Sequence, residues 1–177
     1  DKPLVVRESA LTTNTLHSTN TLKETNLIVD IQIAEEKVIE KKYDTIFTQS
    51  HLQQWLDKIT QSSLFAFDTE TTSLNYMEAE IVGVSFSVKA GAAAYVPLKH
   101  NYIGAPEQLD RDWVLAQLKP ILENDAIKKV GQNIKYDAHV LRNHGITLRG
   151  MAFDTMLESY VLNSVATRHN MDDLSEI

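Results

Sequence analysis

The sequence predicts an α/β domain built around a mixed β-sheet. Three observations support this fold class. The apolar run LFAF (64–67) is bounded by polar residues, as a central strand is. The β-rich runs 81–88 and 92–98 are separated by only three residues, which predicts an antiparallel hairpin. Helical patterns alternate with further short apolar runs, an arrangement typical of parallel strands joined by helices.

Residues 1–42 are expected to form a largely flexible linker. Residues 8–26 are rich in Thr, Asn and Ser and show no apolar period, so they bury too little surface to offset the entropy of ordering. Residues 27–33 could form a short strand, and 34–42 form a charged, solvated segment. The pattern changes at Tyr43, and we place the start of the domain there.

The first part of the domain should contain an edge strand (43–47), a helix and three further strands. Thr48 or Ser50 is expected to cap the helix. Its apolar residues recur at i, i+3, i+4 and i+7, and are Leu52, Trp55, Leu56 and Ile59. We expect the strand 64–67 to be buried on both faces. In the hairpin that follows, Pro97 fits best at the end of an edge strand.

The second part should add a helix, a strand, a helix, a strand and a helix. In chain order these are expected at 107–123, 126–131, 133–145, 147–153 and 155–163. The apolar residues at helical spacing in the first of these helices are Leu109, Trp113, Ala116 and Ile121. Pro120 should kink or split that helix, and Gly145 should end the next one.

Composition limits the class of protein. The 177 residues include 17 Lys and Arg against 24 Asp and Glu, which gives a net charge of −7, and this argues against a protein that coats nucleic acid broadly. The absence of cysteine excludes disulfide scaffolds, iron–sulfur clusters and cysteine nucleophiles. No apolar run approaches the length of about 20 residues that spans a bilayer. We therefore expect a cytoplasmic protein with no membrane partner.

Acidic residues follow the apolar strand directly, in the order Asp68-Thr69-Glu70. Side chains two apart in a strand point to one face, so Asp68 and Glu70 should project together, with their Cα atoms about 6.5–7 Å apart. Two neighbouring carboxylates repel, and burial would raise their pKa values unless a cation lies between them. Oxygen ligands of this kind suit Mg²⁺ or Mn²⁺ better than zinc. The alternative for an isolated D-x-E motif is a helix-capping Asp and a solvated Glu.

A second polar cluster, GQNIKYD (131–137), lies where a predicted strand meets a helix. If Ile134, Ala138 and Leu141 form the buried stripe, Asp137 lies off the core face. The residues then expected on one turn that faces away from the core are Asn133, Lys135, Tyr136 and Asp137. The alternative makes Asn133 an N-cap, Tyr136 a core residue and Asp137 a surface residue. Neither motif is specific alone, but the two together with this strand order are.

Three stretches resemble the proofreading 3′→5′ exonuclease domain of bacterial DNA polymerase I, of gamma-proteobacterial type, in the DEDD exonuclease superfamily. They are FAFDTETTSL (65–74), VGQNIKYD (130–137) and FDTMLESYVLNSVATRHNMDDL (153–174). The resemblance implies a ribonuclease H-like fold with a mixed five-stranded sheet flanked by helices. It assigns 43–177 to the exonuclease domain and 1–42 to an interdomain linker. The implied partners are a single-stranded DNA 3′ end and the polymerase and 5′-nuclease domains of the same parent protein.

The resemblance also implies the roles of individual residues. Two divalent ions, Mg²⁺ or Mn²⁺ with Zn²⁺ as a further option, would clamp the scissile phosphate of the 3′-terminal nucleotide. Asp68 would bridge both ions, Glu70 would help hold one of them, and Asp137 would serve the other. The residues that the resemblance places beside the DNA are Thr69, Leu74, Gln132, Asn133, Tyr136 and Arg168.

One motif of the resembled family is missing from this sequence. The family carries a later Tyr-x-x-x-Asp that supplies a fourth carboxylate and orients the attacking water. Tyr160 is followed four residues later by Ser164, so it is not this motif. We therefore expect a domain truncated at its C-terminus, with weakened metal binding and little or no hydrolysis by this polypeptide alone.

Two other functions remain open. A ribonuclease D-like exoribonuclease shares the D-x-E and FDT features, whereas GQNIKYD, LESYVLNSV and the linker-like N-terminus favour DNA. A non-catalytic module that spaces domains or binds a DNA end is an alternative of another class. Asp154 is expected to cap the helix at 155–163, and His169 to be an exposed loop residue.

Overall fold

The computed structural model describes residues 40–165 and 168–175. The short strand expected at 27–33 and residues 34–39 of the charged segment 34–42 lie outside these ranges, so the predicted linker stays a prediction. Among the described residues, no helix is both long and apolar enough to cross a membrane.

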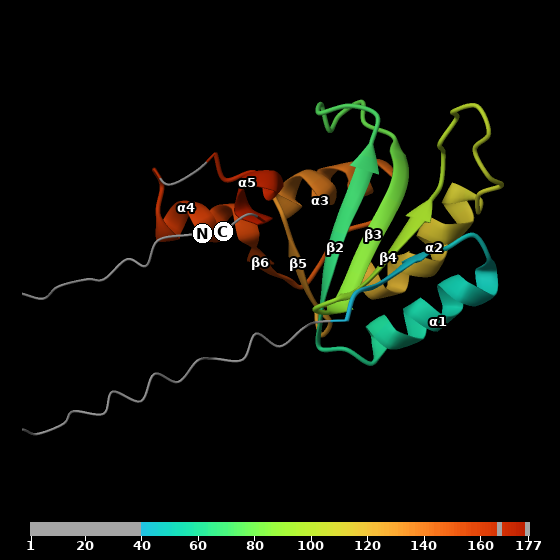
Figure 1. The fold of residues 1–177 in the computed structure, drawn as a ribbon, viewed down its shortest axis with the longest axis horizontal. Coiled ribbons are helices and arrows are strands. Elements are labelled where there is room, and N and C mark those ends of the chain that lie inside the picture. Colours follow the sequence, from blue (N-terminus) through green and yellow to red (C-terminus); the bar gives the residue numbers. More distant parts are fainter. Residues whose placement is uncertain (1–39, 166–167, 176–177) are drawn as a thin grey trace, which may run out of the picture. The chain divides into compact units, whose positions relative to one another are not determined.

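A mixed sheet forms the centre of the described part (Figure 1). Its strands are β1 (Lys42–Thr45), β2 (Leu64–Thr71), β3 (Ile81–Lys89), β4 (Ala92–Pro97), β5 (Lys128–Gly131) and β6 (Met151–Asp154). They lie in the order β1-β4-β3-β2-β5-β6, and β3 runs antiparallel to both of its neighbours while the other pairs are parallel. The sheet therefore has the six strands expected from the residue patterns, one more than the five that the resemblance implies, because both β1 and β6 pair at its edges.

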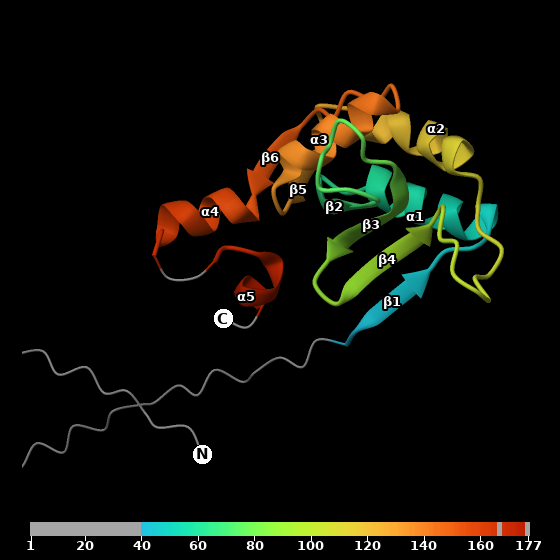
Figure 2. The ribbon, with the colours of Figure 1, turned by 90° about the horizontal axis from the view of Figure 1, so that it is seen from above.

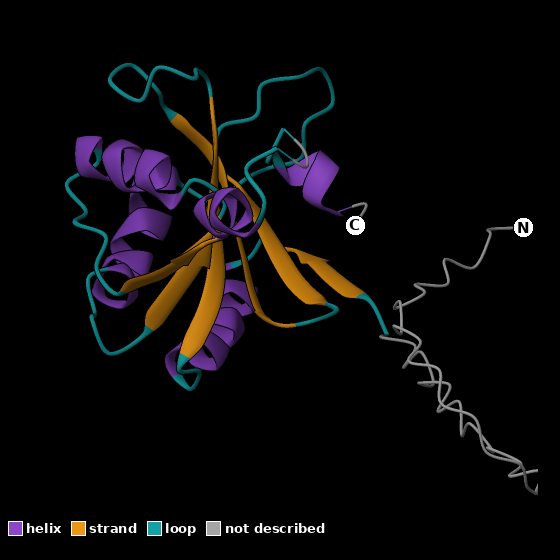
Figure 3. Ribbon diagram, turned by 90° about the vertical axis from the view of Figure 1, so that its left-hand side faces the viewer, coloured by secondary structure: helices purple, strands orange, loops and turns teal. Residues whose placement is uncertain are grey.

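The helices are α1 (Gln49–Thr60), α2 (Arg111–Leu122), α3 (Ile134–Asn143), α4 (Thr155–Leu162) and α5 (Met171–Ser175). Figure 2 shows α1, α2 and α3 together on one face of the sheet, with α4 at the β6 edge. The short helix α5, beside the C-terminal mark in Figure 3, lies on the other face. The sheet thus has one face covered by helices and one that the described residues leave largely open.

Strand β2 shows this two-sided environment directly. Phe65, Phe67 and Thr69 are buried, whereas the alternate residues Ala66 and Asp68 are only half-buried. The expectation that this strand is buried on both faces was wrong. Successive side chains point to opposite faces, and only the face that carries the phenylalanines packs against helices. The other face carries small and acidic side chains.

The predicted helices form, with one shift in register. In α1 all four expected apolar residues are buried, and the Thr48 hydroxyl accepts a hydrogen bond from the His51 amide. Helix α2 begins four residues later than expected, after the N-cap Asp110, and runs through Pro120 as a single helix. Its buried residues are Val114, Leu115, Leu118, Ile121 and Leu122. Of the expected stripe, Ile121 is buried and Leu109 and Trp113 pack half-buried against the core, whereas Ala116 is exposed, so only Ala116 was wrong.

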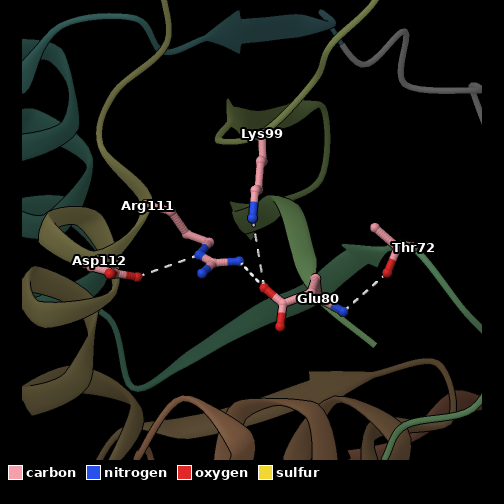
Figure 4. Close-up of polar contacts among 5 residues, drawn as sticks. All are labelled: Thr72, Glu80, Lys99, Arg111 and Asp112. Carbon is pink, nitrogen blue, oxygen red and sulfur yellow. Dashed lines mark hydrogen bonds and ion pairs between the residues drawn. The ribbon is translucent and has the colours of Figure 1, made fainter. Parts of the chain in front are cut away.

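An ion-pair network ties together the loops that follow β2 and β4 (Figure 4). Arg111 donates from Nη1 to Glu80 Oε2, and Lys99 Nζ lies 3.9 Å from the same oxygen. The Glu80 amide donates to the Thr72 hydroxyl at 3.1 Å. The hydrogen bond and the positive charge of Arg111 lower the pKa of Glu80. These contacts therefore hold both ends of the loop between β2 and β3 in place.

Pro97 is the last residue of β4, which is an inner strand because β1 pairs with it, so the edge position expected for Pro97 was wrong.

Lys129 is a buried charge in β5. Its side chain is 0% exposed, and its ammonium group donates to the Asn124 carbonyl oxygen at 2.7 Å and lies 5.8 Å from the centre of the Phe65 ring. Burial is the main reason that its pKa falls to about 8. The neighbouring charge of Lys128 lowers the pKa further, while Asp125 raises it.

Apolar side chains remain exposed along β6 and α4. Helix α4 has no buried residue, and Leu162 is 85% exposed. A cleft of about 590 Å³ lies between α4, β6 and the start of α3, and its apolar lining includes Met151, Phe153 and Leu157.

Candidate active site

Two of the predicted acids project from the open face of the sheet. Asp68 pairs with Ser85 of β3 and is half-buried, and Glu70 pairs with Gly83 and is exposed. Their register becomes irregular directly afterwards, between Glu70 and Thr71, where β2 ends. The alternation of the strand therefore places both carboxylates on one face, as the sequence predicts.

The third acid, Asp137, reaches β2 from the covered face. Its side chain is 1% exposed, and its Oδ1 accepts hydrogen bonds from the Thr69 amide at 3.0 Å and from the Thr69 hydroxyl at 2.5 Å. The expectation that Asp137 faces away from the core was wrong. Ile134, Asp137 and Leu141 are three and four residues apart, so they share one helical stripe, and that stripe is buried.

The three carboxylates influence one another through Asp68. Burial and the nearby charge of Glu70 raise the pKa of Asp68 to about 6. Burial also raises the pKa of Asp137 to about 7, with a contribution from the charge of Asp68, while the hydrogen bonds from Thr69 act in the opposite direction. Asp68 is thus the acid whose charge connects the other two.

The donor set fits a hard divalent cation, because all three groups are carboxylates and Mg²⁺ and Mn²⁺ prefer oxygen ligands. The described residues do not, however, gather three or more His, Asp or Glu side chains closely enough to enclose an ion. One reason is that Thr69 holds Asp137 Oδ1 on the covered face of β2. Asp68 and Glu70 are therefore the accessible pair.

A hollow of about 240 Å³ lies beside Asp68 on the open face. Its lining includes Ser85, Ser87, Gln132 and Met171. Gln132 follows β5, so the hollow joins the end of the acidic strand to the turn that precedes α3.

Tyr136 anchors the loop after β2. Its hydroxyl lies 2.6 Å from the Thr71 hydroxyl and donates to the Ser73 carbonyl oxygen. Leu74 follows at once and is 96% exposed. Tyr136 is half-buried and packs against the core, so it combines a structural contact with a position beside the exposed Leu74.

The side-chain amide of Gln132 is hydrogen-bonded to other residues of the protein. Its Oε1 accepts a hydrogen bond from the Thr155 hydroxyl at 2.5 Å, and its Nε2 donates to the His169 carbonyl oxygen at 2.7 Å. Arg168, next to His169, is exposed. The expectation that His169 is exposed was wrong, because it is 2% exposed and its ring lies 3.8 Å from that of Tyr160.

Asp154 caps α4, as expected. Its Oδ1 accepts hydrogen bonds from the Met156 and Leu157 amides at 3.1 and 3.3 Å. The same oxygen accepts from the Asn133 amide, a contact that sequence reasoning missed. The contacts of Thr155 and His169 with Gln132 were missed for the same reason. They join residues 23 and 37 positions apart, which leaves no periodic signal in the sequence.

Comparisons with known proteins agree with this geometry. The sequence profile of a family described as 3′-5′ exonuclease matches residues 43–176. DNA polymerase I of Pseudomonas aeruginosa is 58% identical over 77% of this chain, and DNA polymerase I of Rhizobium leguminosarum is 41% identical over 76% of it. The chain spans 15% of the length of each of these relatives.

Solved structures share the fold. The structure titled POL domain of Pol1 from M. smegmatis matches 76% of this chain and 22% of its own length, with a TM-score of 0.58 and 22% identity. Brucella melitensis NrnC with bound Mg²⁺ matches 76% of this chain and 59% of its own length, with a TM-score of 0.53 and 20% identity. Since the family profile covers most of the chain, the conclusion rests on it: this chain belongs to the 3′-5′ exonuclease family.

Proposed function

We propose that this chain is the exonuclease domain of a DNA polymerase I. Within the whole polymerase such a domain removes the 3′-terminal nucleotide from single-stranded or frayed DNA with two divalent ions, whereas this polypeptide alone is expected to show little or no hydrolysis. The observation that carries the proposal is the placement of Asp68 and Glu70 on the open face at the end of β2, with Asp137 held against the same strand. The family membership supports the reaction type.

In this proposal Asp68 and Glu70 would hold Mg²⁺ or Mn²⁺ from the open face, and Asp137, which Thr69 holds against the same strand, would serve the second ion in part through water, as the resemblance implies. When bound, such ions lower the pKa of an attacking water and offset the charge that develops on the leaving 3′ oxygen. The family resemblance assigns Asp68 to both ions, and its half-buried carboxylate lies on the open face of the sheet. Thr69 positions Asp137 through its amide and hydroxyl.

The 3′ end of the DNA is proposed to lie across the hollow beside Asp68. Leu74, four residues after Glu70 in the sequence, offers an exposed apolar side chain suited to contact with the last bases. The resemblance also assigns contacts with the DNA to Thr69, Asn133, Tyr136 and Arg168. Gln132 would act on the DNA indirectly, by holding Thr155 and His169 in place, because both ends of its side-chain amide are already hydrogen-bonded to them.

Metal binding gives the direct test. Isothermal titration with Mn²⁺ should show binding by the wild-type chain and an affinity reduced at least about tenfold by Asp68→Asn. Asp112→Asn is the matched control, because it also removes a carboxylate but from a side chain that is 81% exposed on α2. An Mn²⁺ affinity that Asp68→Asn leaves unchanged would contradict the proposed metal site.

The choice of nucleic acid needs its own test. Single-stranded DNA and RNA oligonucleotides of matched sequence, labelled at the 5′ end, should be compared for binding in the presence of Mn²⁺. We expect the DNA to bind more tightly. Preference for the RNA would contradict the DNA polymerase assignment and favour an exoribonuclease.

A further inference from the structure

The turn between β5 and α3 contains a strained residue. Asn133 has φ 57° and ψ 44°, and within the described ranges only Asn133 and His169 have positive φ among residues other than glycine. The left-handed conformation is unfavourable for residues with a Cβ atom, although Asn tolerates it better than most. Something in the structure must therefore hold Asn133 in place.

Asp154 provides that restraint. Gly131 and Asp154 are paired residues of β5 and β6, which brings the Asp154 side chain beside the turn. Its Oδ1 accepts from the Asn133 amide at 3.1 Å while it also caps α4. Asp154 is only 9% exposed, and its Oδ2 makes no hydrogen bond in the described part of the chain.

In this turn the side-chain amide of Gln132 is hydrogen-bonded, whereas, in the part of the chain that the structure describes, that of Asn133 is not. Thr155 fixes the Gln132 side chain by donating to its Oε1. The Asn133 side chain, by contrast, does not cap α3 and makes no hydrogen bond to the described residues. It is half-buried at the start of the helix that carries Asp137. An amide in this position can donate to a phosphate oxygen.

We propose that Asp154 is a positioning residue, which holds Asn133 in the left-handed conformation so that its side-chain amide binds a phosphate of the DNA 3′ end. This inference rests on the proposed exonuclease function. Asp154 acts through Asn133 and touches neither the DNA nor the ions. The capping of α4 is then a second use of the same carboxylate oxygen.

Variants of the two residues separate these uses. Asp154→Ser keeps a good N-cap for α4 but has a shorter side chain, so it should release the Asn133 amide. Asp154→Asn keeps an acceptor oxygen of the same reach and serves as the conservative control. Asn133→Gly removes the amide group and adopts positive φ without strain. The fourth protein is the double variant, Asn133→Gly with Asp154→Ser.

Affinity for DNA is the readout. The probe is a single-stranded oligodeoxynucleotide with a 5′ fluorescein and a 3′-terminal phosphorothioate linkage that slows hydrolysis, and binding is followed by fluorescence anisotropy with Mn²⁺. Asp154→Ser and Asn133→Gly should each weaken binding about tenfold, and Asp154→Asn less than about threefold. The double variant should bind no more weakly than Asn133→Gly alone, because the two residues act as one unit. Affinity for Mn²⁺ should remain unchanged in all four.

Wild-type affinity from Asp154→Ser, or additive losses in the double variant, would overturn the positioning role. If Asp154→Ser does not fold, Asn133→Gly still decides, since unchanged DNA affinity in that variant overturns the proposal. A wild-type chain that binds neither Mn²⁺ nor the oligonucleotide would instead count against the proposed function itself, so the two failures are distinguishable.

Discussion

Replacing Lys129 with methionine should stabilise the domain at neutral pH. Methionine keeps a similar length and removes a charge that is 0% exposed. The fall in the pKa of Lys129 from 10.5 to about 8 corresponds to about 3.4 kcal/mol of unfavourable free energy for the buried charge at pH 7. The ammonium group lies beside the loop that holds Asn124 and Asp125, so we discount this value by half for solvent screening, to about 1.7 kcal/mol. Loss of the hydrogen bond to Asn124 costs about 0.5–1 kcal/mol, which leaves a net gain of about 1 kcal/mol.

The dependence on pH gives a second, independent readout. Between pH 8 and 10.5 the unfolded chain keeps a proton on Lys129 that the folded chain has released, so the free energy of unfolding of the wild type should rise with pH in this window. The Lys129→Met variant should lack this rise. Urea unfolding at pH 7 and pH 9.5 measures both effects, with Lys128→Met as the exposed neighbouring control. Destabilisation by Lys129→Met at pH 7, together with the same pH dependence in both proteins, would refute the reasoning.

Three further predictions concern packing and the exposed surface. Thr69→Val removes the hydroxyl donor to Asp137 and should lower the free energy of unfolding by about 1–2 kcal/mol in urea titrations, whereas Thr69→Ser should change it little. Gly131→Ala should cost about 1–3 kcal/mol in the same assay, because a Cβ would lie 2.9 Å from the Phe67 carbonyl oxygen; wild-type stability would show that the backbone adjusts. The exposed apolar side chains of α4 should make the wild-type chain self-associate as its concentration rises. Leu162→Lys should reduce this self-association in sedimentation velocity, because Leu162 is 85% exposed. Equal self-association by both proteins would contradict a contact through Leu162.

Local periodicity explains what the sequence could predict. The direction of Asp68 and Glu70 follows from the period of two in a strand, and the buried stripe and N-cap of α1 follow from helical spacing. These features depend on residues a few positions apart. For that reason the strands and helices were found in nearly the right places.

The errors came from contacts between distant segments. Asp137 was expected off the core face because Ile134, Ala138 and Leu141 were expected to form the buried stripe, yet Asp137 is itself buried and Thr69, 68 residues earlier, supplies its hydrogen bonds. No local pattern distinguishes Lys129 from its exposed neighbour Lys128, although Lys129 is buried. The shared cap at Asp154 depends on the pairing of β5 with β6, which no local pattern in the sequence encodes.

The alternation of side chains along β2 also restricts changes in the length of this strand. Asp68 and Glu70 use one face of the strand while Thr69 uses the other to hold Asp137. Inserting or deleting one residue within β2 would exchange these faces, turning the acids toward the phenylalanine-lined core and the threonine toward solvent. A change in the length of β2 would therefore disturb its register with β3 and the contact of Thr69 with α3 together.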